Sequence, residues 1–136
     1  MSQTKPSVER RPLSPHLGIY RMQINMVMSI VHRITGAALY FGTVLLAAWL
    51  ISAALGANAF AFVNGLFAHP LGKFVLFGYS WALLHHMLGG VRHLIWDTGR
   101  AMSPKASDTL GWLTIIGSVA LTALLWIVAL SQRGGI

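Results

Sequence analysis

The sequence contains no cysteine and very little charge. Only 10% of its 136 residues are charged, and just three are acidic, whereas soluble proteins carry roughly 25% charged residues. Without cysteine the chain can form no disulfide framework, no iron–sulfur cluster and no thiolate metal site. Because 55% of the residues are hydrophobic and the mean hydropathy is +0.64, so short a chain cannot cover itself with polar surface. Its outer surface must face lipid or other subunits.

The formal net charge of +7 at pH 7 suggests either nucleic acid or a membrane surface as a partner. Nucleic-acid-binding proteins spread basic residues over one face of a soluble fold, interleaved with aromatic residues. In this sequence the basic residues flank apolar runs, which is where they anchor helices at a membrane surface. The pattern favours a membrane protein over a nucleic-acid-binding protein.

The N-terminal segment does not have the composition of a signal peptide. Residues 1–23 combine charged residues with three prolines and lack an apolar core. Pro12 and Pro15 would break the amphipathic helix of a transit peptide. We therefore expect residues 1–28 to be a cytoplasmic segment of irregular structure, as in a bacterial protein.

Three apolar runs, residues 36–56, 74–91 and 109–132, contain no charged residue. A helix crosses the hydrocarbon core of a bilayer in about 20 residues, and a backbone in lipid must satisfy its own hydrogen bonds. With their polar flanks, the runs predict transmembrane helices at about 29–56, 70–97 and 109–132. The predicted fold is all-α: a three-helix transmembrane domain, residues 29–136, that forms part of a helical bundle.

The distribution of basic residues predicts the orientation. Lys73 and Arg133 lie on one side of the predicted membrane, and the other eight basic residues lie on the opposite side. Because cytoplasmic segments carry the excess of lysine and arginine, we expect a cytoplasmic N-terminus and a periplasmic C-terminus. The expected location is the bacterial inner membrane.

The predicted second helix carries most of the polar chemistry. A repeat of about 3.6 residues gives two stripes: His86, Gly90, His93 and Asp97 form one, and His85, Gly89 and Arg92 form its neighbour. A neutral imidazole in mid-membrane needs a partner, for which a haem iron is suitable. The two glycines leave room for a macrocycle or for another helix. Packing alone would explain the glycines, whereas the group of histidines favours a functional site.

A second cluster lies at the expected start of the first helix, where Ser29, His32, Arg33 and Gly36 share one helical face. A serine hydroxyl and an arginine guanidinium are good donors to a quinone carbonyl or a haem propionate. The alternative is that Arg33 anchors the helix at the interface and that Ser29 is its N-cap. Both clusters are expected at the same membrane face, which favours one shared site.

Three segments carry a specific resemblance: residues 11–20 (RPLSPHLGIY), 29–36 (SIVHRITG) and 86–97 (HMLGGVRHLIWD). Together they resemble the cytochrome b556 subunits of succinate dehydrogenase, over nearly the whole chain. The resemblance implies that His86 is an axial ligand of haem b, opposite a histidine of a second anchor subunit. It places His32, Arg33 and His93 near the haem propionates, and Ser29, Arg33 and Asp97 at the ubiquinone site. His85 is an alternative ligand that points about a quarter turn away.

The same resemblance implies a function in the tricarboxylic acid cycle and the respiratory chain. The chain would anchor complex II, while a flavoprotein and an iron–sulfur subunit oxidise succinate and pass electrons to ubiquinone. The subunit itself would not oxidise succinate.

Three other functions remain open from the residues. The chain could be a haem b anchor of another membrane dehydrogenase, although the motif at residues 29–36 argues against this. It could be a proton-translocating subunit without haem, in which Arg33, His86, His93 and Asp97 form a path. It could also be an assembly subunit whose polar residues only pair with neighbouring helices.

Overall fold

The computed structural model describes residues 20–132, which form four helices and no strand. The helices are α1 (Ile24–Leu55), α2 (Ala57–Ala68), α3 (Pro70–Asp97) and α4 (Pro104–Gln132). By length and composition α1, α3 and α4 are each able to cross a membrane, so the prediction of an all-α fold with three long apolar helices is confirmed. Most of the predicted cytoplasmic segment lies outside the described residues.

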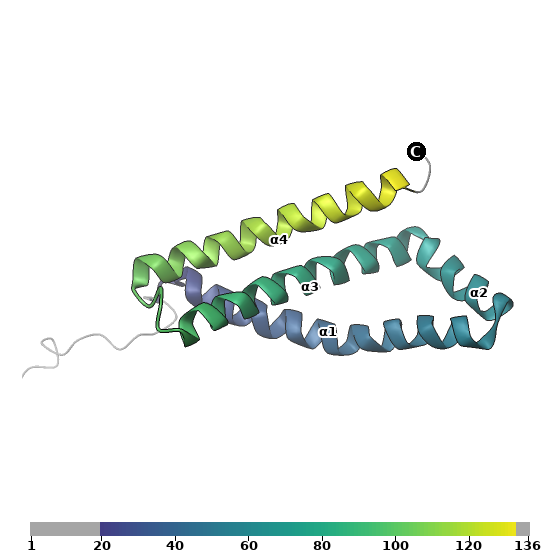
Figure 1. The fold of residues 1–136 in the computed structure, drawn as a ribbon, viewed down its shortest axis with the longest axis horizontal. Coiled ribbons are helices and arrows are strands. Elements are labelled where there is room, and N and C mark those ends of the chain that lie inside the picture. The colour runs from purple at the N-terminus through teal and green to yellow at the C-terminus, as the bar shows by residue number, and fades with distance from the viewer. Residues whose placement is uncertain (1–19, 133–136) are drawn as a thin grey trace, which may run out of the picture.

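The three long helices run antiparallel to their neighbours in the chain, with α3 packed against both α1 and α4 (Figure 1). The start of α1, the end of α3 and the start of α4 therefore meet at one end of the molecule. A hydrogen bond of 2.7 Å from Asn25 Nδ2 to Asp108 Oδ1 joins α1 to α4 at this end. Residues far apart in the sequence are thus brought together near the N-terminal end of α1.

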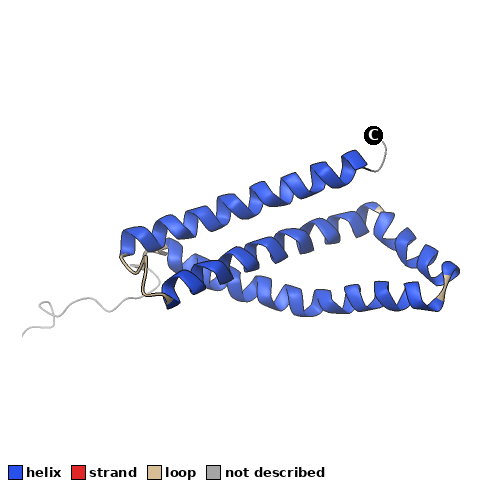
Figure 2. Cartoon of the chain, in the orientation of Figure 1, coloured by secondary structure: helices blue, strands red, loops and turns tan. Residues whose placement is uncertain are grey.

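The helix α2 was not predicted from the sequence. It fills the connection between α1 and α3 with a turn-bounded helix of 12 residues (Figure 2), too short to cross a bilayer core that needs about 20. Gly56, at φ +111°, lets the chain turn between α1 and α2, and Pro70 begins α3. Trp49 Nε1 donates to Asn64 Oδ1 at 3.1 Å and ties α2 back to α1.

Two of the long helices also begin earlier than expected. The helix α1 begins at Ile24 rather than Ser29, and α4 begins at Pro104 rather than Thr109. The expected starts followed the edges of the uncharged runs. A helix can nevertheless extend beyond the hydrocarbon wherever its polar side chains reach the interface. Proline at the first position of α4 is compatible with a helix, because that residue needs no hydrogen-bond donor.

Burial in the bundle is the reverse of burial in a soluble protein. Among the described residues the buried hydrophobic side chains are Met28 and Ala82, and many large apolar side chains are exposed. The buried polar side chains are Thr35, Ser52, His85, Arg92, Thr114, Ser118 and Thr122. Small and hydroxyl-bearing residues let membrane helices approach closely. The apolar exterior is suited to lipid or to partner helices.

Candidate functional site

The imidazole rings of His32 on α1 and His86 on α3 are stacked. Their centroids lie 3.9 Å apart and their planes differ by 5°. Glycines provide the space on both helices, since a Cβ atom on Gly36 would lie 3.0 Å from His86 Cε1 and one on Gly89 would lie 2.5 Å from His32 Nδ1. The glycines therefore set how closely α1 and α3 approach at this pair.

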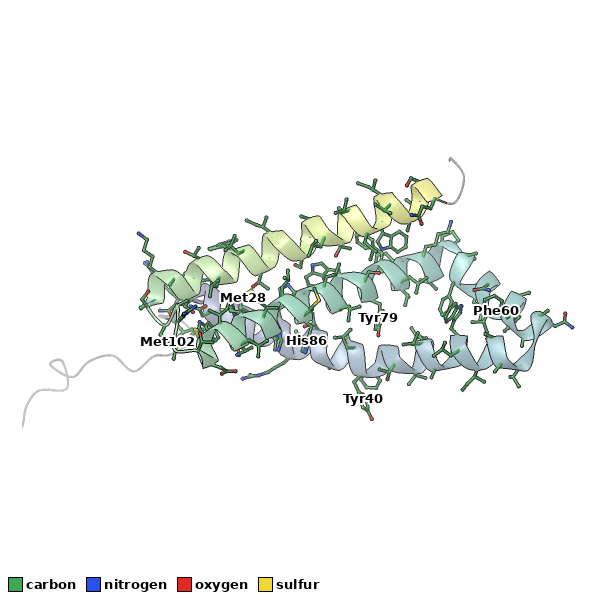
Figure 3. The ribbon with its side chains drawn as sticks, in the orientation of Figure 1. Met28, Tyr40, Phe60, Tyr79, His86 and Met102 are labelled. Atoms are coloured by element: carbon green, nitrogen blue, oxygen red, sulfur yellow. The ribbon has the colours of Figure 1, made fainter. Side chains whose placement is uncertain are left out.

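One nitrogen of His86 is held by α1. Its Nδ1 lies 3.1 Å from the carbonyl oxygen of His32 and 3.3 Å from Thr35 Oγ1. Because a carbonyl can only accept, Nδ1 carries the proton in this contact, and the lone pair is on Nε2. A metal-binding histidine is commonly oriented in this way, by donating its other N–H to a backbone carbonyl. The ring, labelled on α3 in Figure 3, is half-buried and thus fits an axial ligand of haem.

His85, the residue before His86, contacts a different helix and faces α4. Its side chain is only 2% exposed, and its Nδ1 lies 3.2 Å from Ser118 Oγ on α4. Its Nε2 is buried without a hydrogen-bond partner. The packing of α4 leaves no space for a macrocycle against this ring, so the geometry favours His86 over His85 as an iron ligand.

His93 and Asp97 lie further along α3, towards the end where α1 begins. The ring of His93 is 5.4 Å from that of His32 and 5.2 Å from that of Trp96. The side chains of His93 and Asp97 are both exposed. The structure therefore joins His32, His86 and His93 in one group, with Asp97 one turn beyond it.

Ser29 and Arg33 flank His32 on α1. Ser29 is half-buried and Arg33 is exposed. Because Gln23 precedes the first turn of α1, Ser29 lies inside the helix, and the alternative interpretation of Ser29 as an N-cap is wrong. Within the described part of the chain no hydrogen bond or ion pair links Ser29, Arg33 and Asp97 to one another.

The group does not form a site for a bare metal ion. In residues 20–132 no three histidine or acidic side chains are arranged to hold one. A single imidazole with one oriented nitrogen instead offers one axial position to a haem.

Two contributors were not predicted from the sequence. Thr35, which is buried, contacts His86 Nδ1, and Ser118, also buried, contacts His85 Nδ1. Thr35 follows His32 by one turn within the motif at residues 29–36, and this spacing could have indicated its role. Nothing local in the sequence links Ser118 to His85, because the contact depends on how α4 rotates against α3.

Comparison with known proteins adds independent evidence. The model of the family described as "Succinate dehydrogenase/Fumarate reductase transmembrane subunit" matches residues 7–125. The succinate dehydrogenase cytochrome b556 subunit of Rickettsia felis is 41% identical over 128 residues, 93% of this chain and 100% of that protein. The subunit of the same name from Paracoccus denitrificans is 42% identical, covering 87% of this chain and 91% of its own length. The mitochondrial cytochrome b560 subunit of Sus scrofa is 38% identical, covering 84% and 71% respectively.

Proposed function

The chain belongs to the succinate dehydrogenase/fumarate reductase transmembrane subunit family and is a membrane anchor of succinate dehydrogenase, and from this premise we propose that it binds haem b through His86 and forms part of a ubiquinone-reduction site. The observation that carries the proposal is the 3.1 Å contact between His86 Nδ1 and the His32 carbonyl. It fixes the ring and leaves the lone pair of Nε2 for a ligand. The name cytochrome b556 of the relatives supports a b-type haem at this position.

The polar residues around His86 have the chemistry to hold the haem edge. Haem propionates are anionic, and Arg33 offers a guanidinium beside the stacked ring of His32. His93 extends the same group towards the end of the bundle. Bound there, the haem would supply one-electron transfer. The residues of this chain orient it and tie α1 and α3 to a partner.

The quinone site is assigned to Ser29, Arg33 and Asp97. Reduction of a quinone to a quinol takes two electrons and two protons, so the site must hold the carbonyl oxygens and stabilise developing negative charge. Ser29 can donate a hydrogen bond to a neutral carbonyl, and the cation of Arg33 suits an oxygen that gains charge. Asp97 is exposed at the last residue of α3, where it can exchange protons with water.

The subunit depends on partners for succinate oxidation. It has no cysteine for an iron–sulfur cluster, so a flavoprotein and an iron–sulfur subunit oxidise succinate and deliver the electrons. A second small transmembrane anchor would supply a further histidine to hold the haem together with His86. In this proposal the chain belongs to an enzyme complex without carrying out succinate oxidation itself.

The multi-pass chain lies in the bacterial inner membrane with its N-terminus in the cytoplasm and its C-terminus in the periplasm. Basic residues are in excess at the end of the bundle where α1 begins and α3 ends, and this excess supports the orientation. The quinone site then opens at the cytoplasmic face, where the water-soluble subunits would deliver electrons.

Replacement of Arg33 tests the quinone assignment. In the intact complex, Arg33→Ala should lower quinone-linked succinate oxidation by roughly 100-fold, as for the loss of one charged contact to a reacting oxygen. Succinate oxidation measured with an artificial dye should stay unchanged. Arg21→Ala is the matched control, because Arg21 is an exposed cation just before the same helix. Equal losses in both assays would show that Arg33 supports assembly and not quinone reduction.

A further inference from the structure

Arg92 is a buried cation that the proposed haem and quinone sites do not use. Its side chain is 4% exposed, and its Nε and Nη1 atoms have no hydrogen-bond partner. The guanidinium lies where α1, α3 and α4 converge, since Nη1 would be 3.6 Å from a Cβ atom on Gly111, next to Met28. A cation with unsatisfied donors in so apolar a place needs an anion.

The described residues do not supply that anion. Of the two acids, Asp97 is exposed at the end of α3, and Asp108 Oδ1 accepts a hydrogen bond from Asn25. The contact that Arg92 does make is with the face of Trp96, whose ring centroid is 4.7 Å from the guanidinium carbon. A cation–π contact uses the face of the guanidinium, so the N–H groups of Arg92 can still donate hydrogen bonds to an acceptor nearby.

A narrow groove leads to Arg92 between α3 and α4. Its volume is about 120 Å³, and apart from Arg92 and Thr114 its lining is apolar: Leu88, Val91, Ile95, Leu110 and Leu113. No residue of α1 lines it, so it opens on the outer surface of the helix pair. Val91 and Leu113 are 45% and 58% exposed, as expected for side chains in contact with lipid.

The depth of Arg92 in the membrane matches that of a phosphate group. With 28 residues at about 1.5 Å each, α3 is about 42 Å long, the thickness of a bilayer with its headgroups. Arg92 precedes the final residue of α3 by five positions, which is about 7.5 Å. It therefore lies at the boundary between headgroups and hydrocarbon, within reach of a lipid phosphate.

We propose that Arg92 is the receptor for the phosphate of an anionic phospholipid, one acyl chain of which lies in the groove between α3 and α4. Basic pockets between transmembrane helices are known to bind anionic headgroups. The lipid phosphate would accept hydrogen bonds from the unpaired N–H groups of Arg92, and the acyl chain would pack against both α3 and α4. This inference is independent of the haem and quinone assignments.

The test is to count phospholipids retained by the intact complex after extensive washing in mild detergent, by native mass spectrometry. The wild type should retain an anionic phospholipid that Arg92→Gln loses by about fivefold, the effect of one basic residue at an anionic surface. Arg100→Gln, which removes an exposed cation at the same end, should retain it. Equal retention by Arg92→Gln and the wild type would overturn the proposal.

A second variant covers the case in which Arg92→Gln does not assemble. Leu113→Trp leaves the guanidinium intact and fills the groove from an exposed position, so it should also lose the lipid. Unchanged retention in this variant would contradict the placement of the acyl chain.

Thermal unfolding of the wild-type complex separates the sources of the anion. Phosphatidylglycerol should raise the unfolding temperature, whereas phosphatidylcholine and inorganic phosphate should not. An equal rise with inorganic phosphate would mean a site for free anions and would refute the lipid. If Arg92→Gln destabilises the complex with no change in lipid content, Arg92 pairs with a carboxylate of a partner subunit, and the proposal fails.

Discussion

His85 and His86 are adjacent in sequence, yet they lie in two different environments. His85 faces α4, is 2% exposed and contacts Ser118 Oγ. His86 faces α1, is half-buried and contacts the His32 carbonyl. Successive residues of a helix point about 100° apart, so α3 buries His85 against α4 and leaves His86 only half-buried beside α1. The comparison shows that the neighbouring helix, and not the residue type, determines which histidine is available to a ligand.

The largest expected effect comes from closing the space between α1 and α3. In Gly89→Ala the new Cβ atom would lie 2.5 Å from His32 Nδ1, so His32 and its stacked partner His86 must move. Overpacking of this kind costs about 1–3 kcal/mol, and we expect most of the haem to be lost from the purified complex. The haem content per complex, from absorbance, is the measurement.

Gly90→Ala is the matched control, because nothing lies within 4 Å of a Cβ atom at that position. It should retain its haem. Equal loss of haem from both variants would show that the close approach of α1 to Gly89 does not determine haem binding.

A smaller effect is expected on the closed face. Ser118→Ala removes the hydroxyl that contacts His85 Nδ1 and leaves that nitrogen buried without a partner. Hydrogen bonds between membrane helices contribute about 0.6 kcal/mol on average, so thermal stability should fall slightly while the haem spectrum stays unchanged. A changed spectrum in Ser118→Ala would contradict the separation of the two faces.

The smallest effect is expected at Thr35. Thr35→Val removes the 3.3 Å contact with His86 Nδ1 but keeps the stronger one to the His32 carbonyl. The haem should remain bound, with a small shift in its reduction potential, because the hydrogen bonding of an axial imidazole affects its basicity. A redox titration of the haem absorbance measures the shift. Complete loss of haem would mean that Thr35, and not the backbone, orients the ring.

Much of the fold could be predicted from the sequence, since three uncharged runs of bilayer length allow few alternatives. The helix α2 could not, because its 12 residues are too few to span a bilayer and their apolar composition does not distinguish a helix from a loop. The expected starts of α1 and α4, at about residues 29 and 109, also lie later in the sequence than the observed starts at Ile24 and Pro104. Charge indicates where the hydrocarbon ends, which is not where the helix ends.

The candidate site could be predicted in part. Helical periodicity separated the stripe of His86 from that of His85, and the structure places these stripes against different neighbours. Periodicity gives no rotation of one helix against another, so the stacking of His32 on His86 and the contact with Ser118 could not be foreseen. The buried, unpartnered state of Arg92 was equally beyond the sequence, because it depends on three helices meeting.

The most direct test of the account is the reduced-minus-oxidised spectrum of the intact complex carrying either His86→Leu or His85→Leu. The haem b band should be lost from the His86 variant and retained by the His85 variant, because the Nε2 atom of His85 is buried against α4 whereas the ring of His86 is only half-buried. Retention of the band in His86→Leu, or its loss from both variants alike, would contradict the claim that α1 and α4 assign the two histidines to different roles.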